Sequence, residues 1–95
     1  MSDRDLYVEK AKAKLDQWNA EIAKLQAKAE AAGADAKIEY RRQIDDLRAQ
    51  RDAAEARLRE VSEASDGAWA DMKSGFDKAW DNVSDAFDKA MARFR

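Results

Sequence analysis

The stretch W-A-D-M-K-S-G-F-D-K-A, residues 69–79, is followed directly by W-D-N-V-S-D-A-F-D-K-A, residues 80–90, and Met91 opens a third, shorter copy. Eleven residues span three helical turns at about 3.67 residues per turn, so this repeat places its large apolar side chains on one helix face. This aromatic face consists of Trp69, Met72, Phe76, Trp80, Val83, Phe87, Met91 and Phe94. Its burial is worth on the order of 10–20 kcal/mol, so we expect another surface to cover it.

Upstream of this repeat, two segments carry apolar residues at alternating steps of three and four, the heptad spacing typical of helices that pair in a coiled coil. They predict one helix over about residues 4–32 and another over about 35–64. Gly33 suits the left-handed position after the first helix, and Asp35 suits the cap of the second. If the chain reverses at Gly33, the two stripes face each other in an antiparallel hairpin. Its expected core consists of Val8, Leu15, Trp18, Ile22, Leu25, Tyr40, Ile44, Leu47, Leu58 and Val61.

A second candidate break between helices, after the one at Gly33, is Ser65-Asp66-Gly67, and it has two interpretations. As a turn and cap, it starts a third helix over about residues 66–94, within a single all-helical domain that spans residues 1–95. As helix interior, Gly67 costs only about 1 kcal/mol. The apolar stripe also passes through this point in phase, because Val61, Ser65 and Trp69 are four residues apart. The sequence leaves both interpretations open.

Three surfaces are candidates for covering the aromatic face: the hairpin of the same chain, the third helix of a second copy, and a membrane. Heptads favour left-handed supercoiling and an eleven-residue repeat favours right-handed winding, so we expect the third helix to pack poorly along the hairpin and well against its own copy. The predicted fold is therefore all-α, a hairpin followed by a self-associating amphipathic helix, with a closed three-helix bundle as the alternative. The third candidate is a membrane surface. Anionic lipid would repel residues 66–95, which hold six Asp against five Lys and Arg.

The residue inventory argues against an enzyme. The chain has no histidine and no cysteine, so its serines have no imidazole beside them, and it contains no nucleotide-binding glycine motif. We expect no catalytic residue, no cofactor and no metal site. The four aspartates that share one side of the third helix are interpreted as a solvated acidic stripe: Asp77, Asp81, Asp85 and Asp88.

Charge and composition bound the partners. Charged residues make up 40% of the chain, with 18 Lys and Arg against 20 Asp and Glu, and proline is absent. This profile is typical of long helices, and the near-balance predicts no nucleic-acid binding. The opening M-S-D-R-D lacks the features of a leader peptide, and no apolar run approaches the length of a membrane span. The expected location is the cytoplasm.

The tail with its paired tryptophans, Trp69 and Trp80, and the step Lys73-Ser74-Gly75 resembles the ends of small bacterial helical proteins described as coiled-coil-domain or stress-response-like. The resemblance implies a non-enzymatic protein of poorly defined function that is linked to stress conditions. We therefore expect an interaction or scaffold protein, a dimer in preference, that self-associates or captures a protein partner through the aromatic face. The alternative is reversible association with a membrane surface through the same helix.

Overall fold

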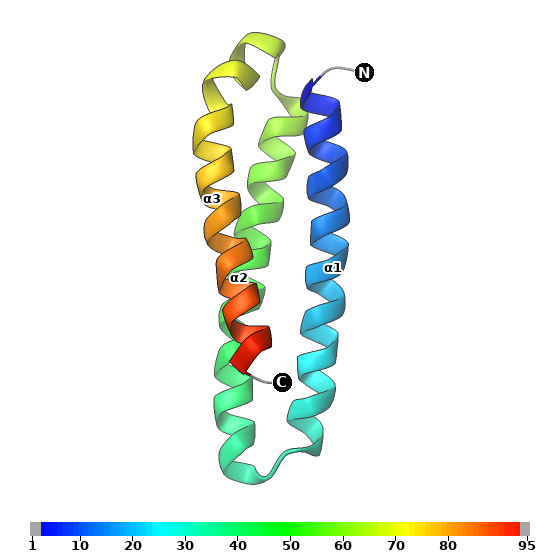
Figure 1. The fold of residues 1–95 in the computed structure, drawn as a ribbon, viewed down its shortest axis with the longest axis vertical. Helices are drawn as coiled ribbons and strands as arrows, with labels where there is room; N and C mark the ends of the chain where they lie inside the picture. The colour runs from blue at the N-terminus through cyan, green and yellow to red at the C-terminus, as the bar shows by residue number, and fades with distance from the viewer. Residues whose placement is uncertain (1–2, 94–95) are drawn as a thin grey trace.

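The computed structural model describes residues 3–93, which form three helices and no strands. They are α1 (Asp3–Ala31), α2 (Ala34–Glu63) and α3 (Asp66–Arg93). Figure 1 shows them side by side, with α2 antiparallel to both neighbours, in a body of 51 × 20 × 19 Å. The prediction of an all-α fold is confirmed. The helices form a closed three-helix bundle, the fold that the sequence analysis gave as the alternative to a hairpin with a self-associating third helix.

The link between α1 and α2 differs from expectation in its conformation. Gly33 is the N-cap of α2, with φ −67° and ψ 166°, and no side chain caps the helix. Within residues 3–93 no residue has a positive φ. The predictions of a left-handed Gly33 and of Asp35 as the cap of the second helix are therefore both wrong. Helix α2 thus begins after a residue in the extended conformation, and such a conformation does not require glycine.

The link between α2 and α3 is a turn of two residues, so these helices are separate. Ala64 follows the end of α2 with φ −73° and ψ 147°, and its N–H donates to the Val61 carbonyl. Ser65 is the N-cap of α3, because its Oγ accepts the Ala68 N–H at 3.2 Å. The Ser65 carbonyl also accepts the Trp69 N–H at 2.8 Å, which is the first helical bond of α3.

The hairpin stripes lie in the core of the bundle. Eight of the ten expected residues are buried, namely Leu15, Trp18, Ile22, Leu25, Ile44, Leu47, Leu58 and Val61. The other two, Val8 and Tyr40, are half-buried and pack against this core. Arg51, a polar residue in the α2 stripe, points its guanidinium outward and donates to Asn19 Oδ1 at 3.0 Å. The heptad spacing therefore identified residues that are buried, and a long charged side chain in the stripe still reaches solvent.

The third helix packs on the hairpin of its own chain, which was the alternative to self-association in the sequence analysis. Trp18 of α1 is 1% exposed, and its ring stacks on Phe87 of α3 with centroids 5.0 Å apart. Long aromatic side chains bridge helices whose ridges do not interdigitate evenly, because a ring reaches further than an aliphatic group. The difference in period therefore does not prevent closure within one chain.

Candidate interaction site

The aromatic face is covered mainly by the chain's own hairpin. Its buried members are Trp69, Phe76, Val83 and Phe87. Its half-buried members are Met72, Trp80 and Met91. Phe94 lies outside the described residues. Ala90 is buried as well, and our sequence analysis missed it, although the repeat places it in the same position as Ala79.

Six rings from α1 and α3 form a continuous chain of contacts, which we call the aromatic ladder. It begins with Tyr7, which makes an edge contact with Trp69 at 5.0 Å between centroids and with Phe76 at 6.3 Å. Phe76 stacks on Trp80 at 5.3 Å, and Trp80 lies 4.8 Å from Trp18. The Trp18–Phe87 stack completes the ladder. These contacts make α1 and α3 interdependent, since pairs of this kind are worth about 0.5–1.5 kcal/mol beyond the area they bury.

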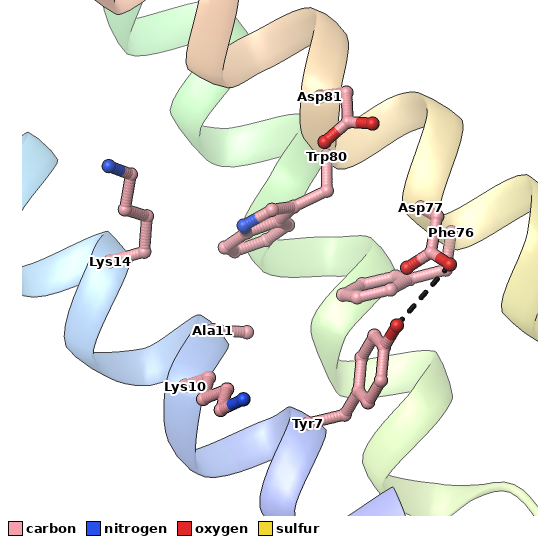
Figure 2. Close-up of a pocket in the computed structure, with 8 residues that line it drawn as sticks. All are labelled: Tyr7, Lys10, Ala11, Lys14, Phe76, Asp77, Trp80 and Asp81. Atoms are coloured by element: carbon pink, nitrogen blue, oxygen red, sulfur yellow. Dashed lines mark hydrogen bonds between the residues drawn. The ribbon is translucent and has the colours of Figure 1, made fainter.

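The seam between α1 and α3 is the open one of the bundle. The backbones of these two helices approach each other at fewer places than those of α1 and α2. A cleft of about 350 Å³ lies between them, and Figure 2 shows its lining. Ala11, Phe76 and Trp80 form the apolar part of the lining. An apolar cleft of this size beside half-buried Trp80 is a surface that another apolar group can enter.

The two walls of the cleft carry opposite charges. Lys10 and Lys14 lie on α1, and Asp77 and Asp81 lie on α3 (Figure 2). None of the ion pairs found in residues 3–93 crosses this cleft. The walls are joined instead by Tyr7, whose hydroxyl donates to Asp77 Oδ2 at 3.3 Å. Among the described residues, the lysines of one wall therefore form no ion pair with the aspartates of the other.

Tyr7 also links both walls electrostatically. The Lys73 ammonium lies 5.2 Å from the centroid of its ring, within the range of a cation–π contact. Partial burial raises the pKa of Tyr7, and the hydrogen bond to Asp77 and the negative charges of Asp77, Asp81 and Asp3 raise this pKa further. The Tyr7 hydroxyl therefore stays protonated and remains a donor at neutral pH.

Packing is also incomplete on the other side of α3. Two hollows of about 170 and 180 Å³ lie between α2 and α3, and Phe76 lines both of them as well as the α1–α3 cleft. The backbone of Gly75 leaves open space there, since a Cβ at this position would meet nothing within 4 Å. The middle of α3 is thus held by its rings, with unfilled space on both flanks.

The described residues offer no grouping for a metal ion, and the aspartates of the acidic stripe belong to no cluster of ligands. No helix in residues 3–93 is both long and apolar enough to cross a membrane. What the site presents is apolar and aromatic surface bordered by charge. Protein–protein interfaces combine an apolar centre with a polar rim in the same way.

No family model, curated protein or solved structure matches this chain. The resemblance of its tail to small bacterial stress-response-like proteins therefore stays a prediction.

Proposed function

We propose that this chain is a non-enzymatic helical interaction protein, and that the aromatic face of α3 is the surface through which it self-associates. The observation that carries the proposal is the loose enclosure of this face by its own hairpin. Phe76 borders three unfilled spaces, and Trp80 is only partly buried beside the open α1–α3 cleft. A second copy that contacts Trp80 would bury apolar surface that the monomer leaves in contact with water.

The charges of α3 support a protein partner over a lipid surface. Asp77 and Asp81 border the cleft, and they would meet repulsion from anionic headgroups. The lysines of the opposite wall offer a second copy a complement for these aspartates. The proposed link to stress conditions rests on the resemblance of the tail, and a comparison of the protein's abundance in stressed and unstressed cells tests it.

The test is the solution mass of the protein across a wide range of concentration, measured by sedimentation. We expect a dimer in equilibrium with a 10.7 kDa monomer. If a second copy docks directly on the half-buried part of the face, Trp80→Asp places a charge in that interface and should shift this equilibrium toward the monomer while the circular dichroism stays helical. Ser74→Asp is the matched control, because it adds the same charge at an exposed position of α3 and should leave the equilibrium unchanged.

Two results would contradict the proposal. A protein that stays monomeric up to millimolar concentration does not self-associate. A protein that floats with phospholipid vesicles, and loses this property in the Trp80→Asp variant, uses the face for a membrane surface instead.

A further inference from the structure

The link between α2 and α3 interrupts the helix at only two residues. Ala64 has φ −73°, which is a helical value, and departs from the helix through its ψ of 147°. The two link residues are Ala64 and Ser65, so the turn contains neither glycine nor proline. Alanine is the residue that favours helix most. A large rotation about ψ of Ala64, confined to this two-residue link, would therefore be needed to join α2 and α3 into one helix.

A continuous helix would also keep its apolar side chains on one face. Leu58 and Val61 of α2 are buried, and the steps from Val61 to Ser65 and from Ser65 to Trp69 are four residues each. The stripe of α2 thus runs into the aromatic face without a change of side. A straight helix over residues 34–93 would be about 90 Å long and would present its whole stripe in one direction.

Two hydrogen bonds hold the turn in its bent form. The guanidinium of Arg4, near the start of α1, donates to the Ala64 carbonyl and lies 3.8 Å from Asp66 Oδ1. The Ser65 hydroxyl accepts the Ala68 N–H. In a continuous helix the Ala64 carbonyl would accept that same Ala68 N–H. Arg4 and Ser65 therefore compete directly with the hydrogen bond that would straighten the link.

We propose that this link is a hinge latched by Arg4, and that two copies of the chain associate by exchanging α3. When the link straightens, α3 leaves its own hairpin and docks on the hairpin of a second copy. The contacts of Tyr7 and Trp18 with the rings of α3 are then formed again between chains, so exchange costs little contact energy. Short links favour such exchange, and the unfilled spaces beside Phe76 reduce what is lost on release. The inference rests on the proposed function, because it specifies how the aromatic face meets a second copy.

The first test blocks the straight form. Asp66 is the first residue of α3, a position where proline fits the closed structure. In a continuous helix the same proline would lie in the interior and break it. We expect Asp66→Pro to raise the dimer dissociation constant about a hundredfold or more relative to Asp66→Ala. The alanine variant is the matched control, since it also loses the contact with Arg4 but leaves the helix free to continue.

The second test weakens the bent form. Ser65→Ala removes the N-cap of α3, which should shift the equilibrium between the bent and the straight link about fivefold toward the straight form in each chain. The dimer has two such links, so its dissociation constant should fall about thirtyfold. Arg4→Ala should also lower it, because the Ala64 carbonyl loses its partner. Ser62→Ala is the control for both, since the Ser62 hydroxyl bonds to the Arg59 carbonyl within α2, away from the turn. Sedimentation gives the masses, and circular dichroism verifies that each variant is folded.

X-ray scattering of the isolated dimer distinguishes exchange from simple docking. An exchanged dimer with 90 Å helices, a length of about 1.5 Å per residue, must be much longer than the 51 Å monomer. If the protein dimerises but Asp66→Pro and Asp66→Ala dimerise equally well, exchange is wrong and self-association stands. If the unmodified chain and the Ser65→Ala and Arg4→Ala variants are all monomers at millimolar concentration, exchange and self-association are both wrong.

Discussion

Replacing Trp18 with alanine should separate the contribution of the aromatic ladder from that of the rest of the core. Trp18 is 1% exposed and lies 4.8 Å from Trp80 and 5.0 Å from Phe87, so its ring joins α1 to α3 at two points. Loss of a buried ring costs about 3–5 kcal/mol in the free energy of unfolding. A small domain has about 5–15 kcal/mol in total. Trp18→Ala should therefore leave a bundle close to the limit of stability at room temperature.

Urea unfolding followed by circular dichroism measures this loss. Leu6→Ala is the matched control on the same helix, because Leu6 is 45% exposed and its replacement should change stability by less than about 0.5 kcal/mol. A double-mutant cycle between Trp18→Ala and Phe87→Ala should give a coupling of about 0.5–1.5 kcal/mol. If Trp18→Ala costs less than about 1 kcal/mol, or if the two losses simply add, the stack does not hold α1 to α3.

Three further outcomes follow from the packing. Ile44→Ala should lower the free energy of unfolding by about 2–5 kcal/mol in the same urea assay, because Ile44 is 4% exposed. Gly75→Ala should raise it by about 1 kcal/mol, since the new Cβ meets nothing within 4 Å and alanine favours helix; a loss would show that the space is not free. The fold raises the pKa of Tyr7, so its contribution is complete below the ordinary tyrosine range and is lost as pH rises through the folded value. The free energy of unfolding of Tyr7→Phe should therefore fall less between neutral and alkaline pH than that of the unmodified chain. Equal falls would exclude this role for Tyr7.

Spacing alone was enough to find the helices and most of their buried sides. Leu25 and Phe87 are both 0% exposed, and each belongs to a stripe identified by its steps of three and four residues. This works because a helix turns by a fixed angle per residue, so sequence spacing specifies the face. The steps do not report which surface covers that face. Whether α3 packs on the hairpin depends on whether large side chains such as Trp18 and Trp80 are long enough to meet across the two helices. The repeat period contains no information about side-chain length.

The turns show a second limit. The sequence is compatible with Ser65 in a turn or inside a continuous helix. The hydrogen bond from the Ala68 N–H to Ser65 Oγ, which the sequence does not reveal, identifies Ser65 as the cap of a new helix. The contact of Arg4 with the Ala64 carbonyl joins residues 60 positions apart in the chain, so no local pattern points to it. The left-handed conformation predicted for Gly33 rested on its residue type alone. Glycine adopts the extended conformation found here as readily as the left-handed one.

The ladder also gives the protein an optical signal of its own. The indole rings of Trp18 and Trp80 lie 4.8 Å apart at an angle of 36°, close enough for their electronic transitions to couple and give a signal in near-ultraviolet circular dichroism. One ring belongs to α1 and the other to α3, so the signal exists only while these helices are docked. Helix content in the far ultraviolet does not depend on that docking. Release of α3 from the hairpin is therefore visible as the loss of one band while the other persists, without any label attached to the chain.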